Sequence, residues 1–362
     1  MVPRILFALP SRGGGGGPNS VVQESLGLAS MGVPVRIAID ALNYIDFAAS
    51  YPELRSDAIA LRSYSNPADL SDAMKGVDIA VATTNRSVYD VEEAHKRLSP
   101  DVRVKTRIAY YVQDYEPLFY KPRSDAWQKA VASYSRIPDA VLFAKTDWIC
   151  NTVYANHGIQ VARVQASIDH SIFYPDFRRE EAEMSILAMV RPKTPRRAPV
   201  RTMRILEILA SSMKRVQLRV FGCDSEELSD LSFLISPSIE VVGQRRRTEV
   251  PDLMRRADLF LDLSDYQAFG RASLEGMACG CIPVVPLLGG GSEFAVHGKN
   301  SFVVDTRSDD EIVEAIGMFA EMSAPARLEM RLAALGTAAH YSIKTAALSE
   351  LQLFSNMLAA QE

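Results

Sequence analysis

Short apolar runs alternate with stretches of helical periodicity along most of the chain, which is the pattern of parallel α/β sheets. After the first apolar run, Val22, Leu26 and Ala29 mark one helical face, and Gly32 ends that helix before the next run begins. The chain therefore opens with a strand-helix-strand unit. The apolar runs that we predict as strands in the first half are residues 4–10, 33–40, 77–84, 107–114 and 140–146.

The strand pattern restarts after a polar, turn-rich segment that ends near residue 183. The strands predicted in this second half are residues 185–190, 218–222, 239–243, 259–264 and 282–285. Two such series predict an α/β architecture of two Rossmann-like domains facing across a cleft. We expect the domains at residues 1–178 and 179–340, followed by a final helix at residues 341–362. The apolar positions that we place on one face of this helix are Leu348, Leu351, Phe354 and Leu358.

Composition narrows the class of protein without defining it. The chain has 362 residues, 48% of them apolar and 23% charged, which suits two ordinary globular domains. Its net charge of -4 provides no global field that would recruit nucleic acid. The four cysteines lack metal-binding spacing, so we expect reduced, buried thiols and a cytoplasmic protein. We expect no signal peptide or spanning helix, and contact with the inner face of the cytoplasmic membrane stays open.

In parallel sheets ligands bind beyond the carboxyl ends of the strands, so the loops after the predicted strands are informative. Residues 11–20 follow the first strand and contain five consecutive glycines. Glycines let the backbone approach a ligand closely, and the free N–H groups of the following helix attract anions. The alternative is a flexible surface turn. A dinucleotide fingerprint and a P-loop are both missing from this loop.

Two further loops carry candidate chemistry. Residues 110–120 place Asp114 and Glu116 among aromatic side chains, where carboxylates could accept hydroxyl protons and rings could stack on sugars; the alternative is a purely structural aromatic edge. After the strand at residues 185–190, Arg191 and Lys193 could neutralise a diphosphate. The basic residues that we expect on a solvated helix face instead are Arg196, Arg197, Arg201 and Arg204.

The segment at residues 265–304, DYQAFGRASLEGMACGCIPVVPLLGGGSEFAVHGKNSFVV, joins a glycine turn, a helix with Glu275 and a strand. It resembles the donor-binding signature of glycosyltransferase family 4, whose members have the two-domain GT-B fold and use nucleotide sugars. Other stretches are similar to the family in the same order along the chain. These are the glycine loop, SIDHSIFYP with Asp169, VRPK with its Arg/Lys pair, and HGKNSFVVD at residues 297–305, which is similar to a late strand of the family.

The resemblance implies a role for each matching residue. In the family the helix glutamate, here Glu275, accepts hydrogen bonds from ribose hydroxyls, although an internal pair with Arg271 is the alternative. A second glutamate eight positions earlier is replaced here by Gln267, which can bind sugar hydroxyls but cannot stabilise positive charge at the anomeric carbon. The residues expected to bind the donor are Gly14, Gly15, Gly243, Gln244, Ala268, Phe269, Gly270 and Glu275. The residues expected to take part in catalysis are Asp114, Arg191, Lys193 and Gln267, with Tyr115 and Glu116 on the acceptor side.

The resemblance also implies an activity. We expect a metal-independent, retaining transfer of a sugar from a nucleotide sugar to a glycan or lipid-linked glycan, with the first domain binding the acceptor, the second the donor, and the final helix packing back on the first domain. No cofactor is expected. The sequence YYVQDYEPLFY resembles the WsaF-type rhamnosyltransferases, which make bacterial cell-surface polysaccharides from dTDP-β-L-rhamnose. A nucleotide-sugar epimerase of the same fold, a non-catalytic sugar-binding protein and a nicotinamide-dependent oxidoreductase are the alternatives.

Overall fold

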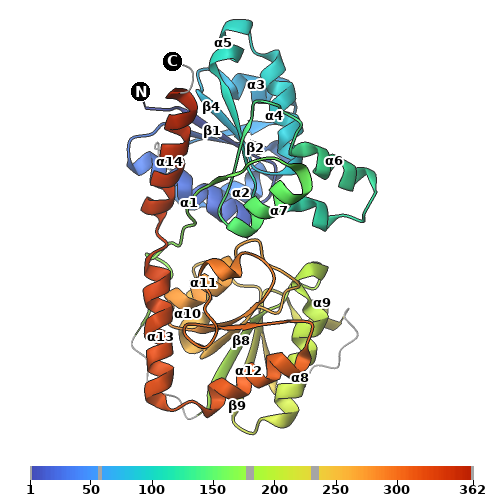
Figure 1. The fold of residues 1–362 in the computed structure, drawn as a ribbon, viewed down its shortest axis with the longest axis vertical. Coiled ribbons are helices and arrows are strands. Elements are labelled where there is room, and N and C mark those ends of the chain that lie inside the picture. The colour runs from blue at the N-terminus through green and yellow to red at the C-terminus, as the bar shows by residue number, and fades with distance from the viewer. Residues whose placement is uncertain (1, 56–58, 177–182, 230–235, 360–362) are drawn as a thin grey trace. The chain divides into compact units, whose positions relative to one another are not determined.

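The computed structural model describes residues 2–55, 59–176, 183–229 and 236–359 (Figure 1). The chain forms two compact units. Unit 1 comprises residues 1–167 and 342–362, and unit 2 comprises residues 168–341. The boundary that we predicted between residues 178 and 179 lies outside the described residues. Each unit contains its own parallel sheet, as the two series of predicted strands require.

The sheet of unit 1 has the strand order β3-β2-β1-β4-β5-β6-β7, and every pairing is parallel. All five strands predicted in this half are present. Two edge strands, β3 and β7, were missed, because β3 exposes part of its length and β7 has only two residues. The strands are β1 (Ile5–Leu9), β2 (Val35–Asp40), β3 (Ile59–Tyr64), β4 (Ile79–Ala82), β5 (Arg107–Tyr111), β6 (Val141–Ala144) and β7 (Ala162–Arg163).

The C-terminal helix belongs to unit 1 and packs along the first helix of the chain (Figure 1). Gly27 permits this approach, because a Cβ atom there would lie 2.7 Å from the Cβ of Ala347. The expected return of the final helix to the first domain is therefore confirmed. The helices of this unit are α1 (Gly16–Ser30), α2 (Tyr44–Ser50), α3 (Pro67–Met74), α4 (Asn85–Arg97), α5 (Pro100–Lys105), α6 (Asp125–Ser133), α7 (Asp147–His157) and α14 (Ile343–Ala359).

Three of the four apolar positions predicted on one face of α14 pack against the core of unit 1. Phe354 is fully buried, and Leu351 and Leu358 are partly buried against the same cluster. Leu348 is 45% exposed instead. The contact also includes Ala346, Ala347 and Glu350, which are completely buried, because α14 approaches α1 closely at a glycine.

Unit 2 is built on a sheet with the order β10-β9-β8-β11-β12-β13. All five strands predicted in this half are present, and the late strand expected from the resemblance is β13. The strands are β8 (Met184–Met189), β9 (Val216–Phe221), β10 (Ile239–Gly243), β11 (Leu259–Leu261), β12 (Ile282–Pro286) and β13 (Phe302–Val304). The helices are α8 (Pro199–Ser212), α9 (Ser225–Ser229), α10 (Val250–Arg256), α11 (Arg271–Ala278), α12 (Asp309–Glu321) and α13 (Ala324–Ala339).

Both sheets reverse their strand order once, and each reversal positions particular loops. In unit 1 the order reverses between β1 and β4, so the glycine loop after β1 lies beside the residues after β4. In unit 2 it reverses between β8 and β11, which pair through Ala188 and Leu261. The loop with Arg191 and the loop that begins at Asp262 therefore flank this point. Ligands of open parallel sheets bind at such reversal points.

Three further features of the described residues concern the cysteines, metal ligands and helix length. All four cysteines are free; three are buried and Cys150 is partly buried. Within the described ranges, no group of three or more His, Cys, Asp and Glu side chains could hold a metal ion. Of the helices that the structure describes, none is long and apolar enough to span a bilayer.

Candidate functional site

A sharp turn after β11 leads the chain into α11. Gly270 caps this helix with a φ of 91°, a left-handed conformation that favours glycine. Its carbonyl oxygen accepts hydrogen bonds from the N–H groups of Ser273 and Leu274. Ala268 and Phe269 precede Gly270 in this turn. The order of glycine turn and helix is the one that the resemblance implies.

Glu275 lies one turn inside α11 and is almost completely buried. Burial raises the pKa of its carboxyl group to about 7, although the positive charges of Arg271 and Arg247 oppose this shift. A helix dipole stabilises an ionised carboxylate near the start of a helix, but desolvation by burial has the larger effect on Glu275. The Glu275 Oε1 atom lies 3.9 Å from Nη1 of Arg271, so the alternative internal pair is also present, at long range.

A second, partly buried ion pair lies close enough to act on Glu275. Arg247 donates from Nη2 to Oδ2 of Asp169 at 3.1 Å, and Asp169 also accepts a hydrogen bond from Ser171. Arg247 is therefore paired and partly buried. Two arginines and two carboxylates thus share this region of unit 2, and the carboxyl group of Glu275 titrates in their combined field.

Arg191 and Lys193 follow β8 but have different surroundings. Lys193 is exposed and donates to Oε1 of Glu227 at 3.1 Å. The Arg191 guanidinium makes no hydrogen bond or ion pair with any residue in the described part of the chain. Although Arg191 is an exposed residue, enough protein surrounds its guanidinium to lower its pKa, first by desolvation and then through the charge of Arg196. An unpaired, partly desolvated cation of this kind suits an anionic ligand.

Gly243 is the last residue of β10, and it lies with Gln244 beside Asp224 and Glu227. Gly243 has a φ of 85°, and a Cβ atom there would lie 3.1 Å from Oδ1 of Asp224. The backbone N–H of Gln244 points to this oxygen at 3.4 Å, and its side-chain amide lies 3.5 Å from Glu227. Both predicted donor residues are therefore linked to the loop that also holds Lys193.

Gln267 is buried between two loops rather than exposed at a surface. Its backbone forms an isolated bridge with Gly289, and its carbonyl oxygen accepts a 2.7 Å hydrogen bond from the N–H of Gly290. Its side-chain amide contacts Asp262 and Ser264. Asp262 was not among the candidate residues identified from the sequence, because it lies within the apolar run predicted as the strand at residues 259–264.

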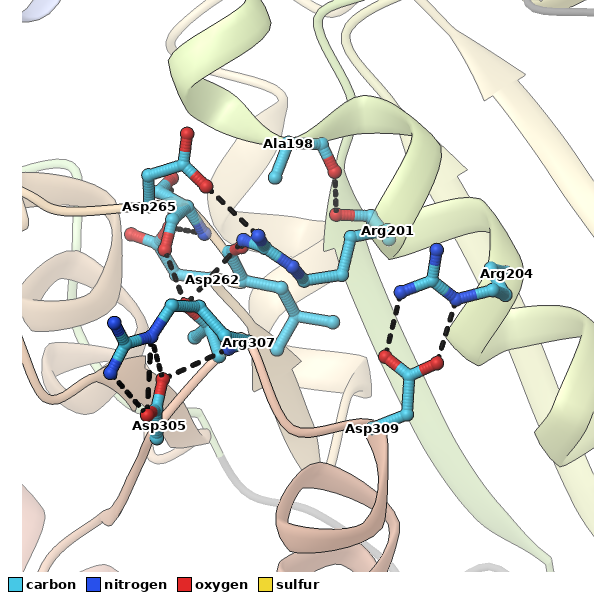
Figure 2. A network of polar contacts seen from close by, with 12 residues as sticks. Ala198, Arg201, Arg204, Asp262, Asp265, Asp305, Arg307 and Asp309 are labelled. Atoms are coloured by element: carbon cyan, nitrogen blue, oxygen red, sulfur yellow. Dashed lines mark hydrogen bonds and ion pairs between the residues drawn. The ribbon is translucent and has the colours of Figure 1, made fainter.

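Arginines of α8 hold the loops around this turn (Figure 2). Arg201 donates to the carbonyl oxygen of Leu263 at 2.8 Å and pairs with Asp265 at 2.9 Å, while Arg204 makes two 2.7 Å hydrogen bonds to Asp309. The prediction that these arginines form a merely solvated face was wrong. Their acidic partners lie more than 60 residues away in sequence, so local charge patterning could not reveal them.

Polar contacts with residues 46 and 51 hold the glycine loop of unit 1. Gly14 has a φ of 81°, and its N–H donates to the hydroxyl of Tyr51 at 3.0 Å. That hydroxyl in turn donates to Asn19 at 2.5 Å. Gly15 precedes α1 without a side-chain cap, so the first N–H groups of this 15-residue helix have no capping side chain.

The acceptor candidates of unit 1 lie in an aromatic cluster. Asp114 is partly buried and its Oδ1 accepts the N–H of Tyr115 at 2.8 Å. The Tyr115 ring stacks on Tyr134 and its hydroxyl pairs with His157 at 3.1 Å. Glu116 is buried, and its Oε2 accepts the N–H of Asn85 at the start of α4 at 2.9 Å. The structural alternative is thus strong for Glu116 and Tyr115, while the role of Asp114 stays a prediction.

Most of unit 2 matches the model of a known protein family. Residues 182–334 match the family model of glycosyl transferases group 1. The uncharacterized glycosyltransferase MJ1178 of Methanocaldococcus jannaschii is 28% identical over 78 residues, 22% of this chain and 22% of that protein. Sucrose synthase 5 of Arabidopsis thaliana is 29% identical over 113 residues, 28% of this chain and 14% of that protein. These matches therefore span less than a quarter of either relative.

The whole chain resembles a solved structure in fold. The crystal structure of Anabaena Alr3699/HepE in complex with UDP and glucose superposes with a TM-score of 0.78 at 16% identity, covering 98% of this chain and 99% of that one. Two units of parallel sheet with a C-terminal helix returning to the first unit constitute the GT-B fold. Residues 182–334, most of unit 2, thus match the glycosyl transferases group 1 model, and the whole chain has the GT-B fold. Both findings agree with the glycosyltransferase expected from the sequence.

Proposed function

We propose that this protein is a retaining glycosyltransferase that transfers a hexose or deoxyhexose from a nucleoside diphosphate to a hydroxyl group of a growing glycan. The observation that carries the proposal is the buried Glu275 in α11, behind the Gly270 turn, in a domain of the group 1 family. A buried carboxylate is stable only when hydrogen-bond donors or a positive charge lie beside it. Adjacent ribose hydroxyls would supply two donors to it.

The other donor contacts follow from the reversal point of the unit 2 sheet. Arg191, which has no partner among the described residues, would bind the diphosphate together with Lys193. Charge-assisted hydrogen bonds of this type stabilise the negative charge that develops on a leaving diphosphate. The N–H groups around Gly270 would bind the sugar or the β-phosphate. Asp114 is our candidate for orienting or deprotonating the acceptor hydroxyl.

The identity of the nucleotide-sugar donor is a more specific proposal. HepE, which shares the fold, has been crystallised with UDP-glucose, so a UDP-sugar is one candidate. The aromatic segment around Asp114 suggests dTDP-β-L-rhamnose as the other, with a bacterial cell-surface polysaccharide as product. Both donors present a nucleoside diphosphate to Glu275 and Arg191, and they differ in the base and the sugar.

Turnover tests this proposal. The purified chain is incubated with UDP-glucose, dTDP-rhamnose or GDP-mannose and a mixture of glycan acceptors, and release of nucleoside diphosphate is measured. We expect release with one donor only, and a product whose anomeric configuration equals that of the donor. Conversion of the donor sugar without an acceptor would indicate an epimerase. Binding of a nucleotide without any turnover would indicate a non-catalytic sugar-binding protein.

The raised pKa of Glu275 predicts how donor affinity depends on pH. Below pH 7 the free protein holds this carboxyl group protonated, and ionisation strengthens its hydrogen bonds to ribose. We expect the affinity for UDP-glucose, or for the donor found above, to rise about tenfold between pH 6 and pH 8. A nucleotide sugar is used because its diphosphate does not titrate in this range. Glu275→Gln should bind more weakly and without this pH dependence; an unchanged slope would assign the titration to another group.

Arg191 should matter more to binding than its exposure suggests. Arg191→Gln removes a cation that is unpaired among the described residues, so we expect nucleoside diphosphate affinity to fall roughly tenfold or more. The matched control is Arg307→Gln, because Arg307 belongs to the same unit but is already paired with Asp305. Calorimetric titration of both variants measures the difference. Equal affinities would remove Arg191 from the diphosphate site.

A further inference from the structure

The side-chain amide of Gln267 has only one orientation that satisfies its neighbours. Its Nε2 lies 2.5 Å from Oδ2 of Asp262 and 3.0 Å from Oγ of Ser264. A carboxylate can only accept hydrogen bonds, so the NH₂ group must face Asp262. All three residues are buried, so these hydrogen bonds form within the protein with little competition from water.

Asp262 is itself held firmly. Its Oδ1 accepts the hydroxyl of Ser264 at 2.6 Å and the backbone N–H of Ser264 at 3.3 Å, and its Oδ2 also faces the hydroxyl of Ser273 at 3.4 Å. Because Ser264 donates its single hydroxyl proton to Asp262, its oxygen is left to accept from Gln267. The network is thus directional: Gln267 donates twice, and Asp262 is the final acceptor.

The consequence concerns the other end of the amide. Oε1 of Gln267 forms no hydrogen bond with any residue that the structure describes. The backbone of Gln267 is fixed as well, through the bridge to Gly289 and the hydrogen bond from Gly290. Both the position and the orientation of this carbonyl oxygen are therefore set by the protein before any ligand arrives.

We propose that Asp262 is a positioning residue that turns the Gln267 amide so that Oε1 serves as an uncharged acceptor for one hydroxyl of the donor sugar. This inference rests on the proposed function, since it assigns a partner within the same donor site. It also explains why glutamine occupies this position. A glutamate here would bring a second carboxylate to within hydrogen-bonding distance of Asp262, and two carboxylates at that distance cannot both ionise.

The first test needs no ligand. Thermal unfolding is measured between pH 5 and pH 8 for the wild type, Gln267→Glu, Asp262→Asn and the double variant. We expect the midpoint of Gln267→Glu to fall with rising pH relative to the wild type, because the two acids must share a proton. The double variant restores one carboxylate facing one amide and should follow the wild-type pH profile. A Gln267→Glu profile parallel to that of the wild type would overturn the proposed orientation.

The second test measures sugar recognition separately from nucleotide binding. Titrations compare UDP with UDP-glucose, and dTDP with dTDP-rhamnose, for the same four proteins. We expect Gln267→Glu to bind the nucleoside diphosphates normally but to lose about tenfold in affinity for the nucleotide sugar, and the double variant to recover most of it. An equal loss for nucleotide and nucleotide sugar would contradict the sugar contact. If the wild type binds none of these ligands, the proposed function fails, whereas the unfolding profiles still decide the orientation of Gln267.

Discussion

Lys145→Met is expected to lower the free energy of unfolding of unit 1 by about 3–5 kcal/mol, because it removes the cation from a buried cluster and leaves its acids behind. Lys145 follows β6 and is 4% exposed, and its Nζ donates to Oε1 of Glu24 on α1. Glu24 and Glu350 are both fully buried. Methionine keeps the length and apolar stem of lysine, so the loss of charge is the main change.

The two acids of this cluster compete for one cation. Burial raises the pKa of Glu350 to about 7, and the charge of Lys145 opposes this shift. Neither carboxylate oxygen of Glu350 has a hydrogen-bond partner among the described residues. Glu350 therefore binds a proton in the folded state at pH values where the unfolded chain has already released it.

That difference fixes the sign of the pH dependence. Between about pH 4.5 and 7 the folded state binds more protons than the unfolded state, so the stability of unit 1 should fall as pH rises. Glu350→Gln removes this titration and should give a flatter profile. Hydrogen exchange of peptides from α1, β6 and α14 measures unit 1 without interference from unit 2. Wild-type protection in Lys145→Met would show that the cluster does not depend on its cation.

Gly289→Ala is expected to disrupt the donor turn of unit 2. A Cβ atom at this position would lie 2.0 Å from the carbonyl oxygen of Gln267 and 2.7 Å from its backbone nitrogen, and the φ of 111° is itself unfavourable for alanine. Backbone atoms cannot move aside as a flexible side chain can. We expect a loss of about 3 kcal/mol or more, together with loss of nucleotide binding.

A matched control separates the steric clash of the added Cβ atom from the cost of the positive φ. Gly280 also has a positive φ, of 80°, but a Cβ atom there would meet no atom within 4 Å. Gly280→Ala should therefore cost only about 1–2 kcal/mol, the cost of the left-handed conformation. Urea unfolding and calorimetric titration of both variants measure the difference. Equal destabilisation would mean that the contact with Gln267 relaxes, and that the turn is more compliant than its geometry indicates.

The sequence predicted the elements that depend on local pattern. The central strands of both sheets are continuous apolar runs because helices cover both faces, and such runs are recognisable without any partner. The helix with Glu275 was recognisable because its turn, its small residues and the following strand are contiguous in sequence. The position of Gln267 followed from its spacing to Glu275.

The features that the sequence did not reveal depend on residues brought together by folding. The role of Asp262 depends on its contacts with Gln267 and Ser264, which only the folded structure shows. The ion pair of Arg247 with Asp169 likewise joins positions 78 residues apart. Glu350 was hidden for a further reason: a charged residue in an amphipathic helix normally faces solvent. The positive charge of Lys145, which lies far away in the sequence, partly offsets the cost of burying Glu350.

Calorimetric titration of the chain with UDP, dTDP and GDP, in parallel with Glu275→Ala, tests the central claim most directly. The account predicts that at least one nucleoside diphosphate binds with micromolar affinity, and that the variant binds it more weakly by roughly 1.5–3 kcal/mol, the contribution of a hydrogen bond to a charged group. Binding that is unaffected by Glu275→Ala would contradict the assignment of the donor site. Absence of binding by all three nucleotides would contradict the proposed transferase itself.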